Sequence, residues 1–470
     1  MARNHLLFVG GDWRPGARGH RLDLIDPATE RGIGQVACAA PDDIDDALAA
    51  AAGALDAWRA RAPDDRGRIL LDAADLLDAR LDAAAADLSE EQGKTVAEAR
   101  GEYARAVETL QWYGANAADL CAPVALDRSR TLVPSAVGVV AAFTPWNYPA
   151  VLNARKLAAP LVAGCTVILK AAEEAPSAGC HLVEVLHEAG APAGVVNLLF
   201  GDPPEISRRL VASAAVKALT FTGSTRVGKQ LAALAAANLQ RCVLELGGHS
   251  PVIVCADTDL PAAARAICDY KFECAGQSCN APSRVIVEAT VYERFLEHLV
   301  AMAGAIRVGD GRDPATDMGP MANARRIEAM RALIGDAVDR GANVLIGGAE
   351  PAGPGFFWPP TILTDVPADA RILREEPFGP VLAVSRFEDF DDAIRQANTT
   401  DYGLASYVFT ASRDRRAQAT AGLAVGSVSF NRLKGIAADA PNCGIDDSGY
   451  GYEGGMEGLR EFQYLKLVNH

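Results

Sequence analysis

The chain has 470 residues, a length that suggests about three domains. Half of its residues are hydrophobic and 22% are charged, which is typical of a folded globular protein. Its net charge of −15 argues against nucleic acid as a partner, because phosphate contacts need clustered Lys and Arg.

Several further classes of protein fit the sequence poorly. Its apolar runs fall short of the roughly 18–20 residues of a bilayer span, and residues 1–13 lack the full apolar region of a signal peptide. The ten cysteines include no CxxC pair and mostly lie in apolar stretches, as reduced cysteines do in a cytosolic protein. Cys274 and Cys279 have no nearby His or second cysteine pair. We therefore expect a cytoplasmic protein with no membrane partner and no metal.

In chain order, the first long pattern is helical. From Asp42 to about Ala118 the chain is rich in Ala, Leu and Glu, with apolar residues three and four positions apart. Strands and helices then alternate. The predicted strands are Val137–Phe143, Thr166–Leu169, Val195–Phe200, Ala218–Phe221 and Cys242–Leu246, and the predicted helices between them include Ala175–Ala189 and Pro204–Ala212.

A second alternating series follows. Its predicted elements are the strands Pro251–Cys255, Arg284–Glu288, Ala342–Ile346 and Val381–Val384 and the helices Pro261–Cys274, Tyr292–Ile306 and Ala322–Arg340. Near-continuous apolar strands that alternate with helices are typical of an α/β fold with parallel sheets covered on both faces. The final segment, Tyr450–His470, is Gly-rich and then amphipathic, a pattern compatible with a strand or arm that docks on a neighbouring subunit.

Polar motifs follow the first two strands of the alternating region. In Phe143–Pro149, two prolines fix a loop where open α/β sheets bind ligands, and Asn147 there can donate its amide to a developing oxyanion. Taken alone, the motif also fits a capping Asn in a Pro-rich turn. Lys170 and Glu173 are spaced to contact ribose hydroxyls, or to start a solvated helix.

Two later strands end in motifs of their own. Phe221–Lys229 runs from a strand through Gly and Ser into a helix, whose N-terminus can bind a phosphate or simply form a tight turn. Glu245 lies at an apolar strand end, where burial raises a carboxyl pKa and suits general base chemistry. A structural ion pair would account for Glu245 equally well.

The segment Tyr270–Arg284 contains two cysteines five positions apart. Cys279 is the candidate nucleophile, because a free thiol is strongly nucleophilic in its thiolate form. Cys274 lies at the end of a predicted apolar helix, and we expect it to be structural.

Taken together, these motifs resemble the NAD(P)-dependent aldehyde dehydrogenase superfamily, and most closely its semialdehyde branch, which includes succinate semialdehyde dehydrogenases. The resemblance spans essentially the whole chain. It rests on six motifs in the order and spacing of that family: PWNYP, the Lys-x-x-Glu strand end, FTGST, LELGG, GQSC and Glu375–Pro380.

The resemblance implies the catalytic roles. Cys279 is expected to attack the aldehyde carbon and form a thiohemiacetal, while Asn147 and the backbone N–H of Cys279 hold the oxyanion. Hydride transfer would leave a thioester, which water activated by Glu245 would hydrolyse. Lys156 corresponds to a lysine that relays protons near this base.

The resemblance also implies an NAD site, with NADP as the alternative. Lys170 and Glu173 match adenine-ribose contacts, and the charge of Glu173 favours NAD because it would repel a 2′-phosphate. The other expected contacts are Ser224 at the pyrophosphate, Glu376 and Phe378 at the nicotinamide ribose, and the neighbouring residues Thr144, Pro145, Trp146, Gly223 and Leu246.

The implied architecture has three parts. These are a Rossmann-type cofactor domain (residues 1–115 and 136–246), an α/β catalytic domain (residues 247–445) and a small bridging sheet for oligomerisation (residues 116–135 and 446–470). The resemblance implies a homodimer or homotetramer.

The substrate residues depart from the family pattern. Candidate contacts are Tyr148, Arg155, Glu273 and Ser278. The succinate semialdehyde branch clamps a carboxylate with two arginines; Arg155 matches one, but Glu273 replaces the other. An Arg155–Glu273 pair would neutralise itself, so we expect a larger, neutral or amine-bearing aldehyde rather than succinate semialdehyde. The alternative places Glu273 in solvent.

Other departures have no assigned role. Arg432 and Lys434 fit either substrate contacts or surface charges, and His249, Asn442 and Cys443 replace residues common in the family.

Two other functions fit the sequence less well. A CoA-acylating dehydrogenase generally lacks the glutamate found here at position 245, and a non-catalytic protein on this scaffold would be expected to lose Cys279, Asn147 or Glu245.

Overall fold

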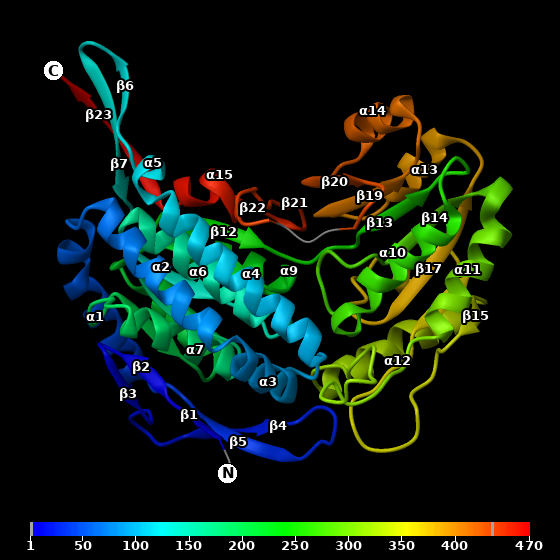
Figure 1. The fold of residues 1–470 in the computed structure, drawn as a ribbon, viewed down its shortest axis with the longest axis horizontal. Coiled ribbons are helices and arrows are strands. Elements are labelled where there is room, and N and C mark those ends of the chain that lie inside the picture. The colour runs from blue at the N-terminus through cyan, green and yellow to red at the C-terminus, as the bar shows by residue number, and fades with distance from the viewer. Residues whose placement is uncertain (1–2, 434–436) are drawn as a thin grey trace.

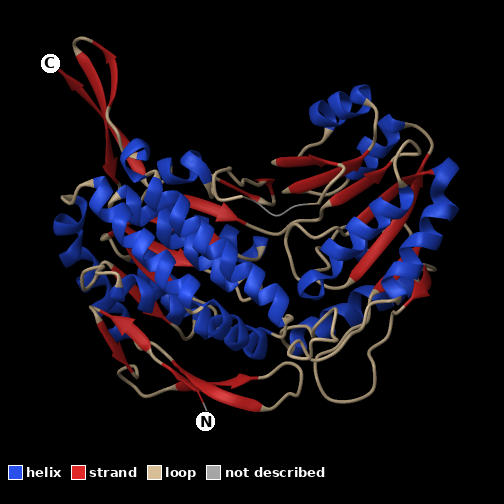
Figure 2. Ribbon diagram, in the orientation of Figure 1, coloured by secondary structure: helices blue, strands red, loops and turns tan. Residues whose placement is uncertain are grey.

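The computed structural model describes residues 3–433 and 437–470, whose strands form two large sheets side by side (Figures 1 and 2). The first sheet has eight strands in the order β22 (Gly449–Tyr450), β12 (Arg241–Glu245), β11 (Val216–Thr222), β8 (Val139–Phe143), β9 (Thr166–Lys170), β10 (Val196–Leu199), β2 (Leu7–Val9) and β3 (Asp12–Arg14). Its five central strands are parallel to one another.

Helices cover this sheet because its central strands are apolar on both faces. The helices are α1 (Pro41–Arg59), α2 (Pro63–Ala79), α3 (Leu81–Gln92), α4 (Val96–Ala115), α5 (Ala117–Leu120), α6 (Pro149–Ala163), α7 (Pro176–Glu188), α8 (Pro203–Ala212) and α9 (Thr225–Ala236). The single helical pattern predicted from Asp42 is thus divided into separate helices, which pack against one another and against α6.

The second sheet has seven strands in the order β15 (Asn343–Ile346), β16 (Thr361–Thr364), β17 (Val381–Phe387), β14 (Arg284–Glu288), β13 (Pro251–Val254), β19 (Ala405–Phe409) and β20 (Ser427–Phe430). Around it lie α10 (Leu260–Phe272), α11 (Tyr292–Gly304), α12 (Ala324–Asp339), α13 (Phe390–Ala397) and α14 (Arg413–Gly422). The short 3-10 turns are η1 (Glu273–Gly276), η2 (Ala289–Val291) and η3 (Arg371–Leu373).

Three small sheets complete the fold. One contains β1 (Arg3–His5), β5 (Gly32–Ala37) and β4 (Arg21–Ile25), another pairs β18 (Tyr402–Gly403) with β21 (Ile445–Asp446), and the third contains β23 (Gln463–Asn469), β7 (Arg130–Ala136) and β6 (Val124–Asp127). The third sheet projects from the body as an arm (Figure 1). The short helix α15 (Gly455–Arg460) packs on α6.

The predicted α/β fold class is confirmed. The prediction missed short or exposed elements such as β1–β5, α13 and α14, and one predicted helix ends early. The helix expected over Pro261–Cys274 ends at Phe272, because Glu273 already has a non-helical ψ of 134°, and Cys274 and Ala275 then have a left-handed φ of 51°. The three-part division of the chain stays a prediction. Among the described residues, no helix combines the length and apolarity needed to cross a membrane.

Candidate active site

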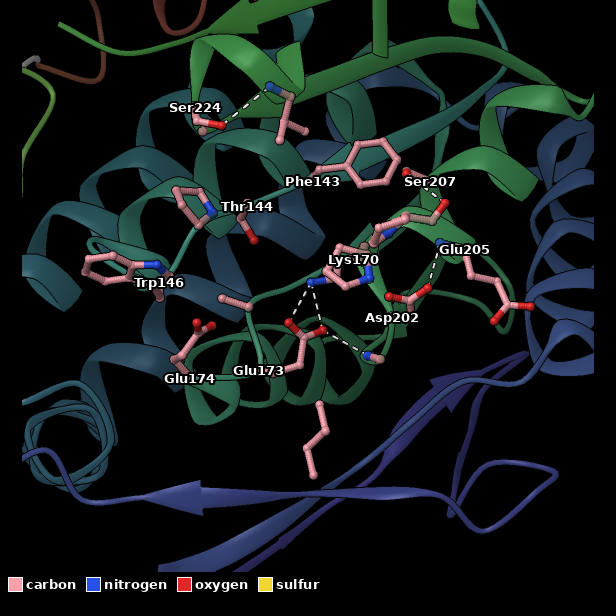
Figure 3. A pocket seen from close by; sticks show the side chains of 18 of the residues that line it. Phe143, Thr144, Trp146, Lys170, Glu173, Glu174, Asp202, Glu205, Ser207 and Ser224 are labelled. Atoms are coloured by element: carbon pink, nitrogen blue, oxygen red, sulfur yellow. Dashed lines mark hydrogen bonds and ion pairs between the residues drawn. The ribbon is translucent and has the colours of Figure 1, made fainter. Parts of the chain in front are cut away.

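The carboxyl ends of four parallel strands bring the predicted motifs to one edge of the first sheet. Phe143 at the end of β8 pairs with Lys170 on β9, and Thr222 on β11 pairs with Glu245 on β12. A cavity of about 1670 Å³ opens along this edge (Figure 3). Segments more than 100 residues apart in sequence therefore share one site, since parallel strands end on the same side.

Cys279 lies against Glu245, the last residue of β12. The Cys279 thiol donates to Glu245 Oε1 over 3.1 Å. Burial, and after it the nearby charge of Glu453, raise the pKa of Glu245 to about 7, although the thiol contact acts to lower it. Burial and the neighbouring Glu245 charge raise the pKa of Cys279 well above that of a free thiol. The resting nucleophile is therefore a protonated thiol that lies against a base able to accept its proton near neutral pH.

Asn147 lies close to the same cysteine loop. Its side-chain amide donates to the carbonyl of Gln277 over 2.9 Å, two residues before Cys279. Its Oδ1 is buried and has no hydrogen-bond partner within residues 3–433 and 437–470. The amide that we expected to stabilise an oxyanion is thus held at the nucleophile's loop.

Lys156 is buried in an ion pair that sequence reasoning missed. Its Nζ lies 2.8 Å from Glu453 Oε1 and 3.0 Å from Thr220 Oγ1. Asn442 holds Glu453 in place, because their backbones exchange hydrogen bonds of 2.7 and 2.9 Å. Nothing in the Gly-rich sequence around Glu453 indicated a partner almost 300 residues away from it in the chain.

The large cavity has the features of a dinucleotide site. Lys170 Nζ lies 2.7 Å from Glu173 Oε1, which also accepts from the backbone N–H of Gly201 over 2.8 Å (Figure 3). Ser224 is the N-cap residue of α9 and accepts from Val227 N at 3.4 Å, and both residues line the cavity, so a helix N-terminus borders it. Thr144, Pro145, Trp146 and Gly223 line the cavity as expected. Size, helix N-terminus and ribose-spaced polar groups all fit a nicotinamide dinucleotide.

The remaining cofactor candidates lie beside this cavity and outside its lining. Phe378 packs edge-on against Trp146, with ring centroids 5.6 Å apart. Glu376 Oε1 accepts from the N–H of Gly248 over 2.9 Å, and burial raises its pKa to about 7. Leu246 packs on α9, where a Cβ at Gly228 would lie 2.4 Å from its Cδ2.

Of the predicted substrate contacts, Glu273 has a cation partner that the sequence did not reveal. Its carboxylate accepts from the Tyr148 hydroxyl over 3.2 Å and lies 3.7 Å from the guanidinium of Arg105 on α4. The cation beside Glu273 is thus Arg105, while Arg155 is buried on α6, and the roles of Arg155 and Glu273 in substrate binding stay predictions. Ser278 is half-buried next to Cys279. Lys434 lies outside the described residues.

His249 has a structural place rather than a chemical one. Its Nε2 lies 3.0 Å from the carbonyl of Ile372 in η3, and its Nδ1 accepts from Arg284 Nε over 3.1 Å. Burial and the Arg284 charge lower the pKa of His249 to about 3, so the ring stays neutral. This contact ties the loop after Glu245 to the turn that precedes Glu376. Cys443 is half-buried, and its carbonyl packs on Gly426.

A thiol beside a buried carboxylate, at the edge of an α/β sheet with a dinucleotide-sized cavity, is compatible with an oxidoreductase that uses a nicotinamide cofactor. Comparison with protein families matches residues 13–468 to the description "Aldehyde dehydrogenase family". The chain belongs to this family and is an oxidoreductase that acts on aldehydes with a nicotinamide cofactor.

Individual relatives cover nearly the whole chain. The chain is 42% identical over 468 residues to 4-(hydroxymethyl)benzenesulfonate dehydrogenase TsaD1 of Comamonas testosteroni, covering 99% of this chain and 98% of the relative. It is 36% identical to succinate-semialdehyde dehydrogenase [NADP(+)] GabD of Escherichia coli, covering 98% and 96%. A solved structure described as an E. coli NADP dependent enzyme has a TM-score of 0.96 and 35% identity over 99% of this chain and 98% of that one.

Proposed function

We propose that the enzyme oxidises an aldehyde to its carboxylate through a thioester on Cys279 that water hydrolyses. The observation that carries this proposal is the 3.1 Å contact between the Cys279 thiol and Glu245, whose pKa of about 7 suits a general base. One carboxylate can then serve both the nucleophile and the later attack by water.

In the first half-reaction, Cys279 Sγ gives its proton to Glu245 and bonds to the aldehyde carbon. The carbonyl oxygen becomes an oxyanion, which the Asn147 amide and the Cys279 backbone N–H stabilise. One N–H of Asn147 Nδ2 donates to the carbonyl of Gln277, 2.9 Å away, and the second is the donor to the oxyanion. When bound, the cofactor accepts a hydride from the former aldehyde carbon.

In the second half-reaction, Glu245 loses the first proton and then takes one from water as water attacks the thioester. The thiolate of Cys279 leaves and the carboxylate product departs. The buried Lys156–Glu453 pair acts on the charge of Glu245, because both groups shift its pKa. We therefore assign Lys156 and Glu453 to the proton route from Glu245.

The charges beside Glu273 support a proposal for the substrate. Glu273 accepts from Tyr148, next to Asn147, and also lines a cavity of about 450 Å³ together with the carboxylates Glu98, Asp269 and Asp317 and one arginine, Arg105. A distal carboxylate would meet the neutralised Arg105–Glu273 pair among further acids, which gives it no net attraction. We propose a larger aldehyde whose far end is neutral or carries an amine.

A second candidate is an anionic aromatic aldehyde. It is favoured by the 42% identity to two relatives named for 4-(hydroxymethyl)benzenesulfonate.

The retained Glu245 favours hydrolysis over transfer of the acyl group to CoA.

The test is NADH formation by the purified enzyme with succinate semialdehyde, benzaldehyde, an amino-aldehyde and 4-formylbenzenesulfonate, compared with Cys279→Ala. We expect the neutral or amino-aldehyde to give the highest kcat/KM and Cys279→Ala to be inactive. A lead for succinate semialdehyde would refute the substrate proposal alone. Full activity of Cys279→Ala would refute the mechanism.

A further inference from the structure

A buried ion pair lies behind the turn that carries Asn147. Lys94, in the link between α3 and α4, and Glu102, on α4, have fully buried side chains whose Nζ and Oε2 are 2.5 Å apart. Neither residue lies at the thiol, and neither is explained by the reaction described above. Buried charges are costly unless they are paired and given further hydrogen bonds, so their other contacts show what they hold.

The two side chains form hydrogen bonds with the backbone of one turn, between Asn147 and Val151. Lys94 Nζ donates to the carbonyl oxygen of Asn147 over 2.7 Å. Glu102 Oε1 accepts from the N–H groups of Ala150 at 2.7 Å and Val151 at 3.3 Å, in the first turn of α6. The pair thus fixes the backbone at Asn147 and at the two residues that follow Pro149.

The contacts of Glu102 replace a missing N-terminal cap of α6. The N-cap residue of α6 is Tyr148, whose side chain makes no capping hydrogen bond. Exposed N–H groups at a helix start favour a carboxylate, and here Glu102 of another helix supplies it. The Lys94 ammonium also lies 4.1 Å from the centre of the Tyr148 ring, which holds the N-cap residue from its other side.

A second buried contact supports the same carbonyl. Gln92 accepts from the N–H of Lys94 over 3.0 Å and donates to Cys274 Sγ over 3.2 Å. The Cys274 thiol in turn lies 3.6 Å from the Asn147 carbonyl oxygen. The carbonyl of Asn147 is therefore anchored from the cysteine loop as well as from α4.

The side chain of Asn147 has little anchoring of its own. Its Oδ1 has no hydrogen-bond partner in the described part of the chain, and one of the two N–H groups of Nδ2 donates to the Gln277 carbonyl, which leaves the second for an oxyanion. The direction of that second N–H depends on where the backbone places Asn147. Small errors in the position of a catalytic group cost large factors in rate.

We propose that Lys94 and Glu102 are positioning residues for the oxyanion donor: they act on the reaction through the backbone of Asn147 and touch no reacting atom. The inference rests on the proposed role of Asn147 in the reaction. It predicts that loss of the pair lowers the rate only when Asn147 is present to be misplaced.

The test is a double-mutant cycle. The variant Lys94→Met/Glu102→Gln removes both charges together, so no unpaired charge stays buried. We expect kcat/KM to fall by about 30- to 100-fold, the KM for the cofactor to change less than about twofold, and Asn147→Ala to abolish any further effect of the pair. A loss that persists in full in the Asn147→Ala background, or a wild-type kcat/KM in the charge-removed variant, would overturn the inference.

A matched control lies at the other end of the same helix. Arg66 is buried and donates to the carbonyl of Val162 over 3.0 Å, near the C-terminus of α6. Arg66→Met should lower the melting temperature but leave kcat/KM within about twofold of wild type, because it loosens α6 away from Asn147. An equal loss of kcat/KM in both variants would show that general loosening of α6 is the cause.

Two further measurements keep the result clear. Hydrolysis of 4-nitrophenyl acetate without cofactor uses Cys279 and the oxyanion site but needs no physiological aldehyde, so the same cycle is read there too. If Asn147→Ala has no effect on either reaction, the proposed role of Asn147 fails. Should the charge-removed variant not fold, Glu102→Asp shortens the carboxylate by one carbon and enters the same cycle with the same expected outcome.

Discussion

At the scale of single residues, we expect Glu245 to control the pH dependence of the reaction. Its pKa is raised to about 7, and only its ionised form accepts a proton. Activity should therefore rise as the pH increases from about 6 to about 8 and be lost as the pH falls through 7.

The neighbouring carboxylate provides the test of this assignment. The charge of Glu453 raises the pKa of Glu245, so Glu453→Gln should move the rising limb of the kcat profile to lower pH. Glu245→Gln should remove that limb and lower kcat by about 10²- to 10⁴-fold. A limb that stays in place in Glu453→Gln, measured by steady-state kinetics between pH 5.5 and 9, would speak against this origin of the pH dependence.

We expect Glu173 to determine the choice between NAD and NADP. Its carboxylate is fixed on both sides, by Lys170 and by the N–H of Gly201, so it cannot easily turn away from a 2′-phosphate. We expect NAD to be preferred and Glu173→Gln, which removes only the charge, to raise the NADP-to-NAD ratio of kcat/KM by about tenfold or more. Glu184→Gln, on α7 and paired with Arg80, is the control and should leave the ratio unchanged. An unchanged ratio in Glu173→Gln would assign the choice to other residues.

At the scale of elements, hydrophobic pattern predicts the buried strands well and the exposed or strained segments poorly. β14 has the predicted bounds, Arg284–Glu288, because its first four residues are buried and both ends carry charge. The strand β4 was missed, since four of its five side chains are exposed. The end of α10 was missed because Cys274 and Ala275 are ordinary helix formers by sequence that tertiary contacts hold at positive φ.

The same contrast holds for the site. Cys279, Glu245 and Asn147 lie in motifs whose order along the chain could be compared with a family, whereas Lys94, Arg105 and Glu453 acquire their roles from partners distant in sequence. A lysine 53 residues before Asn147 has no local signal that it binds the asparagine's carbonyl. Such contacts follow from the packing of α4 on α6 and not from any periodicity.

At the scale of the whole molecule, the projecting arm of β6, β7 and β23 is the surface we expect to join subunits (Figure 1). Leu467 pairs with Leu132, which pairs with Val124, so an apolar row crosses all three strands. Its outer members are open to solvent, with 51% of Leu467 and 55% of Val124 exposed. An apolar row of this kind on an isolated three-stranded sheet favours burial against another copy.

The prediction is that the enzyme is a dimer or tetramer whose assembly depends on this arm. Leu465→Lys/Leu467→Lys, on the strand β23 of this arm, should reduce the mass measured by light scattering after size-exclusion chromatography to that of one chain. The reason is that charged side chains on this strand resist burial. Val344→Lys/Leu345→Lys, on the exposed strand β15, changes a similar amount of apolar surface elsewhere and should leave the mass unaltered. If the arm variant keeps the wild-type mass while the control does too, subunits must associate through a different face. If the variant is monomeric yet retains its kcat/KM, the arm serves assembly alone and each chain holds a complete site, as the positions of Cys279, Glu245 and Asn147 within one chain lead us to expect.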